Sequence, residues 1–240
     1  MTQKLIDKII QVVRYFETGK TVGADYGAIS IYKDGPGNRI QLTYGASQTT
    51  EYGNLKDLLQ MYIDANGSKA QKFKPFMDKV GDLKFPSLSA DSSFMRLIES
   101  ATLDPIMHTV QDAFFLKHYF NPAQTWFTKN NFTLPLSLLV IYDSYVHSGS
   151  IPNFLRNKFS AKVPAEGGDE KTWINLYVNV RDEWLENNTT RPLLQKTDYR
   201  TDSFIHAIRE NNWLLDKSFE VVNYQLKDES DKPNVEAIIV

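Results

Sequence analysis

Apolar residues recur at helical spacing along most of this chain, beginning with its first residues. In residues 3–16, QKLIDKIIQVVRYF, the apolar positions include Ile9, Val12 and Phe16 and form one broad face. This spacing predicts an amphipathic helix. Glycine commonly ends a helix, so we expect the helix to end just before Gly19.

The pattern then changes to a period of two. Apolar and polar residues alternate through residues 26–44, on both sides of the segment Asp34-Gly35-Pro36-Gly37-Asn38. Alternation predicts half-buried strands, and a dense group of turn-forming residues between two such runs predicts a β-hairpin. It is the one strand pair that the sequence marks clearly.

Helical spacing returns in the rest of the chain. We expect further helices at residues 54–65, 73–80, 94–98, 105–119, 132–147, 173–185 and 201–211. The most apolar of them is 132–147, which we expect to be buried on most sides, with Pro135 in its first turn. The loop at 161–171 is a candidate break between two lobes. The chain thus predicts a mainly α fold (α+β) with one small sheet after the first helix.

Composition and charge narrow the classes of function. The 240 residues carry 27 basic and 29 acidic side chains, a net charge of −2, which gives no electrostatic reason to bind nucleic acid or an anionic membrane. The absence of cysteine excludes disulfides, thiolate metal sites and a cysteine nucleophile. The four histidines show no i,i+4 pair, so we expect neither a metal nor another cofactor.

Targeting signals are not visible in the sequence. No apolar run is long enough to span a bilayer. The first residues, Met-Thr-Gln-Lys, are polar and lead directly into the predicted helix, so we identify no signal peptide.

Two carboxyl groups near the predicted hairpin are candidates for acid–base chemistry. Glu17 directly follows Phe16 at the end of the first helix, and a carboxyl beside an apolar wall keeps its proton longer, as a general acid requires. Asp34 lies in a solvated turn, where an ionised carboxylate can act as a base. Such a pair is used for glycosidic bond hydrolysis. The alternative is that Glu17 only solvates a helix end and Asp34 only forms a turn.

The helix that ends in Glu17 and the hairpin that follows resemble the lysozyme superfamily. The runs Ile31–Asp34 and Thr43–Gly45 are similar to the hairpin of phage-type muramidases. The rest of the chain resembles the family 46 chitosanases through a series of short segments in the family's order and approximate spacing: Asn54–Tyr62, Val110–Asp112, Tyr119–Ala123, Tyr142–Gly149, Val180–Trp184 and Tyr199–Asp202.

This resemblance implies a lysozyme-like fold, with two helical lobes flanking a cleft. It implies a single catalytic domain over residues 1–240, with the catalytic helix end and hairpin near 14–50. It also implies an activity, an endo-acting glycoside hydrolase that cleaves the β-1,4 linkages of chitosan with inversion and serves in polysaccharide degradation.

Particular residues match the family's catalytic positions. Glu17 matches the general acid, and Asp34, within Asp-Gly-x-Gly, matches the general base. Asp143 and Arg181 match members of a buried charge network behind the acid, and Arg200 matches its second arginine. A buried aspartate between two arginines can fix the rotamer of the acid and tune its protonation.

The chain departs from the family pattern at two positions. The family has a threonine that holds the attacking water five residues after the base, where this chain has Arg39. We assign that role to Thr43, because Thr43-Tyr44-Gly45 supplies the Thr-x-Gly pattern. A carboxylate that binds substrate in the family is replaced by the neutral Asn54.

The remaining substrate-binding candidates lie near the hairpin. Because chitosan is polycationic, acidic side chains should bind it, and three of them are candidates to compensate for Asn54: Asp25, Glu51 and Asp57. Aromatic platforms often bind sugars, and the hairpin region offers three tyrosines: Tyr26, Tyr32 and Tyr44.

Three hypotheses of function stand together at this point. The first is an inverting chitosanase, in which Glu17 protonates the leaving oxygen and Asp34 deprotonates a water. The second is a peptidoglycan-cleaving muramidase with the same acid, favoured by the phage-like hairpin and by Asn54. The third is a non-catalytic glycan-binding protein. In each case we expect a polysaccharide partner, a monomer, and secretion to reach a polymeric substrate.

Overall fold

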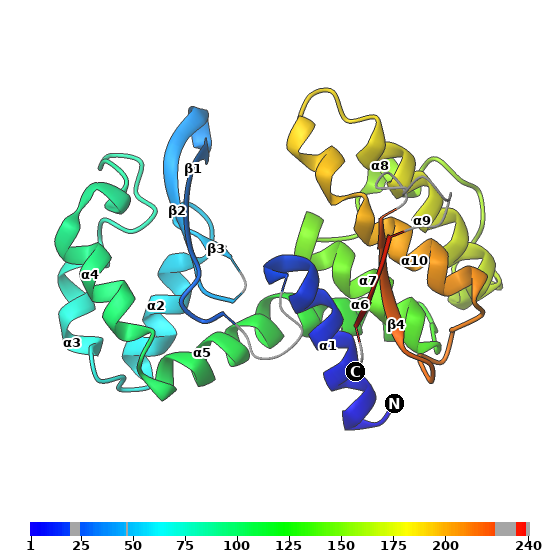
Figure 1. Ribbon diagram of the computed structural model, residues 1–240, viewed down its shortest axis with the longest axis horizontal. Helices are drawn as coiled ribbons and strands as arrows, with labels where there is room; N and C mark the ends of the chain where they lie inside the picture. The colour runs from blue at the N-terminus through cyan, green and yellow to red at the C-terminus, as the bar shows by residue number, and fades with distance from the viewer. Residues whose placement is uncertain (20–24, 47, 224–233, 239–240) are drawn as a thin grey trace. The chain divides into compact units, whose positions relative to one another are not determined.

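The computed structural model describes residues 1–19, 25–46, 48–223 and 234–238, most of which are helical (Figure 1). The chain divides into two compact units. Unit 1 combines Met1–Phe16 with Tyr119–Val240, and unit 2 is Glu17–His118. The mainly α prediction is confirmed.

Unit 2 is built on a three-stranded antiparallel sheet in the order β1 (Ile29–Gly35), β2 (Arg39–Tyr44) and β3 (Thr49–Thr50). A 3₁₀ turn at Pro36–Asn38 joins the first two strands, and Asn38 adopts a left-handed backbone with φ 63°. The predicted hairpin is therefore confirmed. In Figure 1 this hairpin stands beside the helices of unit 2, with α5 across its base.

The helices of unit 2 are α2 (Leu55–Asp64), α3 (Ala70–Phe73), α4 (Ser92–Ala101) and α5 (Pro105–Phe115), with 3₁₀ turns at Lys74–Phe76 and Leu88–Ala90. Asp91 and Asp104 cap α4 and α5 by accepting hydrogen bonds from backbone N–H groups of the first turn. The predicted helix at 73–80 is wrong, because α3 ends at Phe73. Pro75 lies in the 3₁₀ turn that follows and has no N–H to continue an α-helical ladder.

Unit 1 gathers its helices around α7. These are α1 (Gln3–Thr18, of which unit 1 includes the part up to Phe16), α6 (Asn121–Lys129), α7 (Pro135–Ser148), α8 (Asn153–Arg156), α9 (Glu170–Glu186) and α10 (Tyr199–Arg209), with 3₁₀ turns at Pro164–Glu166 and Pro192–Thr197. Residues 135–144 of α7 are all buried, as its apolar sequence predicts. Pro135 is in the first turn and Gly149, with φ 75°, ends the helix.

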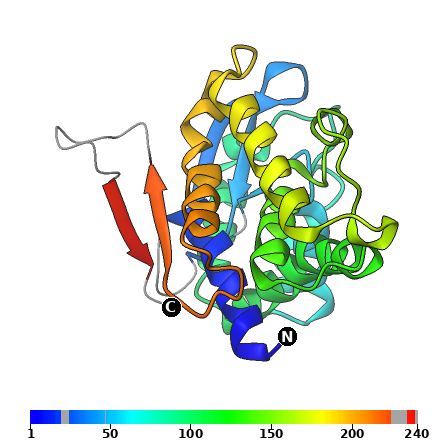
Figure 2. The same ribbon diagram turned by 90° about the vertical axis from the view of Figure 1, so that its right-hand side faces the viewer.

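A second sheet in unit 1 was not predicted. Strands β4 (Phe219–Asn223) and β5 (Asn234–Ile238) pair antiparallel, and β4 packs beside α10 (Figure 2). Each strand has only five residues, too few for a clear alternating pattern. The predicted single sheet is therefore corrected to two sheets among the described residues.

The division between the units does not fall at the loop 161–171. It falls between Phe16 and Glu17, inside α1, and between His118 and Tyr119, inside a π-helical segment at Leu116–Phe120. The loop is part of unit 1 and is anchored there, because Ala165 N donates to Asn130 O at 3.0 Å. The predicted break at this loop is wrong.

Candidate active site

Glu17 lies in the last turn of α1, and the residue before it is held firmly in unit 1. The ring of Phe16 is buried and packs edge-on against Tyr199, with the ring centroids 5.7 Å apart. Its backbone carbonyl accepts two hydrogen bonds, one from Tyr199 Oη at 2.6 Å and one from Arg200 Nη2 at 3.1 Å. The backbone that leads into Glu17 is thereby fixed by α10.

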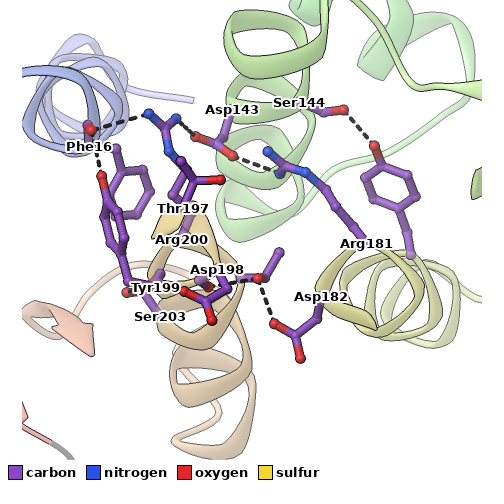
Figure 3. A network of polar contacts seen from close by, with 12 residues as sticks. Phe16, Asp143, Ser144, Arg181, Asp182, Thr197, Asp198, Tyr199, Arg200 and Ser203 are labelled. Carbon is purple, nitrogen blue, oxygen red and sulfur yellow. Dashed lines mark hydrogen bonds and ion pairs between the residues drawn. The ribbon is translucent and has the colours of Figure 1, made fainter. Parts of the chain in front are cut away.

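Arg200 also joins this backbone to a buried charge network (Figure 3). Its Nη1 lies 2.8 Å from Asp143 Oδ1, and Arg181 Nη1 lies 2.7 Å from Asp143 Oδ2. All three side chains are almost completely buried. The network therefore connects α7, α9 and α10 to the end of α1.

The two arginines keep the buried Asp143 ionised. Burial alone would raise the pKa of Asp143, but the guanidinium groups of Arg181 and Arg200 lower it, so the carboxylate stays ionised. One turn further along α7, burial and the same two arginines lower the pKa of His147 to about 3. His147 is therefore neutral near pH 7, and the network carries two positive charges and one negative charge.

Asp34 is an exposed side chain next to an irregularity in the sheet. Tyr32 pairs with Gln41 and Gly35 pairs with Arg39, so two residues of β1 face a single residue of β2. Asp34 is the second of these two residues, and its Oδ1 accepts a hydrogen bond from Gln41 Nε2 at 3.0 Å. Such β-bulges commonly redirect a side chain beside an active site.

The structure does not bring Thr43 to Asp34. Thr43 pairs with Ser30, four residues before Asp34, which corresponds to roughly 13 Å along a strand. Its Oγ1 is within hydrogen-bond distance of Ser30 O at 3.3 Å and Gln48 Oε1 at 3.2 Å. Thr43 thus belongs to the opposite end of the hairpin.

Arg39, at the position where the resemblance implies a threonine, contacts the loop before α4. Its side chain is exposed, and its Nη1 donates to Leu83 O at 2.7 Å. The guanidinium group therefore joins the end of the hairpin to the loop before α4.

The substrate-binding prediction for Tyr44 is corrected. Its side chain is completely buried within unit 2, and its hydroxyl lies 3.1 Å from Thr102 Oγ1. Burial raises the pKa of Tyr44 to about 12. Because Tyr44 and Leu42 share the face of β2 that packs on the helices, Tyr44 is a core residue.

The other two tyrosines lie closer to solvent. Tyr32 on β1 is 62% exposed. Tyr26 is half-buried, stacks on the His108 ring at 4.2 Å and donates to Asp112 Oδ2 at 2.9 Å. Tyr32 is thus a free aromatic surface, whereas Tyr26 is already held against α5.

The acidic candidates also separate into exposed and buried groups. Asn54 precedes α2, and Asp57 is exposed in the first turn of that helix. Glu51 is only 1% exposed and accepts hydrogen bonds from Ser87 Oγ at 2.5 Å and Leu88 N at 2.7 Å. The interpretation of Glu51 as a substrate-binding acid is therefore wrong, since its buried carboxylate binds the loop at residues 87–88.

Asp25 makes a hydrogen bond within its own turn, because its Oδ1 accepts from Gly27 N at 3.2 Å.

Among the described residues, no group of three or more histidine, aspartate or glutamate side chains could hold a metal ion. The described part of the chain likewise contains no helix with the length and hydrophobicity to cross a membrane.

Comparison with known proteins decides the family. Residues 11–219 match the family described as Glycosyl hydrolase family 46. The chain belongs to glycosyl hydrolase family 46. The family 46 resemblance is confirmed, and the protein is a glycosidase.

Relatives of known structure confirm the lysozyme-like fold of this family 46 protein. A Gynuella sunshinyii chitosanase, solved in complex with chitotetraose, superposes with a TM-score of 0.80 at 20% identity, covering 100% of this chain and 99% of the other. The native chitosanase from Bacillus subtilis MY002 superposes with the same TM-score at 22% identity, covering both chains fully. In sequence, the chitosanase of Bacillus subtilis strain 168 is 26% identical over 235 residues, 90% of this chain and 83% of that protein.

Sequence reasoning missed two contacts beside the candidate catalytic residues of this family 46 chain. Tyr199 anchors the carbonyl of Phe16, and its position next to Arg200 in the matched run was the available signal. Gln41 contacts Asp34, and the signal for it was the two-residue spacing from Thr43 on the same face of the strand.

Replacing Asp143 with alanine should destabilise the protein. Both arginines would remain buried without their counter-ion, which costs roughly 3–5 kcal/mol. Urea unfolding of Asp143→Ala should show this loss, while Glu166→Ala, an exposed carboxylate in the same unit, should unfold as the wild type does. An unchanged midpoint for Asp143→Ala would contradict the network.

Stability should fall as the pH is lowered from about 6.5 towards 3. In this window the unfolded chain protonates His147 and the folded chain does not, so each pH unit removes up to about 1.4 kcal/mol of folding free energy. Above the unfolded pKa the effect is fully absent. His147→Asn should flatten this part of the stability–pH curve; equal slopes for variant and wild type would mean that folded His147 accepts a proton.

Proposed function

We propose that this protein is an endo-acting chitosanase that cleaves β-1,4 linkages with inversion. The observation that carries the proposal is the family 46 match over residues 11–219, which includes Glu17 and Asp34. The structure around each of these two residues supports the proposal. Glu17 extends from a helix end that α10 fixes, and Asp34 is exposed on a sheet bulge.

Glu17 and Asp34 have complementary roles in this proposal. Glu17 donates a proton to the glycosidic oxygen as it leaves. Asp34 takes a proton from a water molecule that attacks the opposite face of the sugar. Inverting enzymes hold these carboxyls about 6.5–9.5 Å apart, against about 5–5.5 Å in retaining ones, because a water must fit between base and sugar. We assign Glu17 and Asp34 to the inverting class, with the larger separation, because one residue is at a helix end and the other is in a hairpin.

The substrate follows from what related enzymes bind. The Gynuella sunshinyii chitosanase was solved with chitotetraose, and a mutant of the Bacillus subtilis MY002 chitosanase was solved with 6 GlcN. Chitosan carries protonated amines, which exposed carboxylates attract. Asp57 and Tyr32 are the exposed candidates that we assign to this binding. A polymeric substrate also favours a secreted, monomeric enzyme, as we propose.

Two positions favour a second candidate, a muramidase. Arg39 adds a positive charge at the end of the hairpin, and Asn54 lacks the acidic charge of the family. Both changes reduce the attraction for a polycation. Peptidoglycan, whose stem peptides carry carboxylates, does not require an acidic binding site.

One assay separates these candidates. The protein is incubated with soluble chitosan and, separately, with purified cell wall, and new reducing ends are measured. We expect product from chitosan. Product from cell wall alone would favour the muramidase, and product from neither would favour a glycan-binding protein.

Glu17→Gln should abolish turnover while leaving the fold intact. The amide keeps the shape of the side chain but has no acidic proton to transfer, and loss of a general acid costs on the order of 10²–10⁴ in rate. The matched control is Glu99→Gln, the same change at an exposed position of α4, which should keep wild-type kcat. If Glu17→Gln retained more than about a tenth of wild-type kcat, Glu17 would not be the acid.

A further inference from the structure

The position at which the family holds the attacking water is changed in this chain, and the structure shows a different side chain beside the base. Arg39 reaches Leu83, and Thr43 lies about four residues along the hairpin from Asp34. Among the described residues, the side chain that hydrogen-bonds Asp34 is that of Gln41, with Nε2 3.0 Å from Oδ1.

The backbone around this contact is constrained. At the bulge, the register between β1 and β2 shifts between Tyr32 and Gly35, which turns Asp34 towards the Gln41 side chain. Gly35 continues β1 directly after Asp34, and a Cβ at that position would lie 3.1 Å from the Tyr52 ring and 3.4 Å from Gln41 Cβ. The tight approaches at Gly35 are to Arg39 O at 3.0 Å and to the Tyr52 ring, so glycine allows the strand after Asp34 to pack closely against them.

Gln41 and Asp34 differ in the conformational freedom of their side chains. Gln41 is only 7% exposed, so packing restricts its rotamers, whereas Asp34 is exposed. An exposed aspartate has several accessible rotamers, and a hydrogen bond from a buried amide selects among them. The buried partner thus sets the direction of the exposed carboxylate.

The primary amide has the groups that a water-positioning residue needs. One N–H binds Asp34, and the amide also has a second N–H and a carbonyl oxygen. A water that donates one hydrogen to Asp34 and the other to Gln41 Oε1 is oriented with a lone pair free for attack. A threonine hydroxyl can supply the same acceptor.

We propose that Gln41 is the positioning residue for Asp34 and its attacking water, in place of a threonine. The inference rests on the proposed function, because it needs Asp34 to be the base. It assigns to Gln41 a role in turnover and not in substrate affinity.

The test compares two variants with a matched control. Gln41→Met keeps the length and removes the amide, and Gln41→Glu keeps the shape and removes the N–H donors. The control is Gln60→Met, because Gln60 Nε2 also donates to an aspartate, Asp64 Oδ1 at 2.8 Å, on the exposed surface of α2. We expect both Gln41 variants to lose about 10–100-fold in kcat on chitosan with KM little changed, and the control to keep wild-type values.

A double-mutant cycle separates positioning from a merely structural role. If Gln41 acts through Asp34, Gln41→Met should lower kcat no further in an Asp34→Asn background, since coupled residues are not additive. Equal losses in both backgrounds, or wild-type kcat in Gln41→Met and Gln41→Glu, would overturn the inference. Melting curves of both variants identify any loss of activity that is due to misfolding. If Gln41→Met does not fold, the kcat of Gln41→Glu tests the inference in its place.

Failure of the proposed function has a different signature. In that case wild-type protein releases no reducing ends from chitosan, or Asp34→Asn retains full activity. If wild type is active, Asp34→Asn retains only a small residual kcat and the Gln41 variants are normal, only the role of Gln41 is wrong.

Discussion

Arg200 makes the contacts on which the rest of the site depends. One edge of its guanidinium group binds Asp143, and another binds the carbonyl of Phe16, the residue that precedes Glu17. A planar guanidinium can serve two acceptors in fixed directions, which a lysine ammonium does less well. The end of α1 is thereby oriented by the same side chain that pairs with the buried Asp143 carboxylate in unit 1.

A buried ion network of this kind is not an efficient way to gain stability. Desolvation of the charges offsets most of their attraction, and an apolar cluster of the same volume often stabilises a protein as well. The network instead fixes the orientation of its side chains, because each oxygen of Asp143 faces a different arginine. The pKa of His147, lowered by burial and by both arginines, shows that the surroundings disfavour a further positive charge. A fixed helix end beside a proposed general acid is a reason to keep such a network.

The sequence predicted the features that depend on local patterns. The helical spacing of α1, the turn residues between β1 and β2, and the continuous apolar run of α7 each led to the observed element. It failed where a residue's role depends on distant partners. The chemistry of Tyr44 and Glu51 suggested substrate contacts, but sheet pleating and the loop at 87–88 bury both. The register that places Thr43 opposite Ser30, four residues from Asp34, has no local signature, since it depends on how two strands pair.

We propose that Glu17 and Asp34 act as acid and base on opposite faces of the sugar. Proton NMR of the first products from a β-linked chitosan oligomer tests it most directly, because the anomer is fixed at the moment of water attack. We expect the α-anomer to form first and the β-anomer to appear later by mutarotation. A β-anomer that forms first would mean retention, and Asp34 would then not act solely as a base for water.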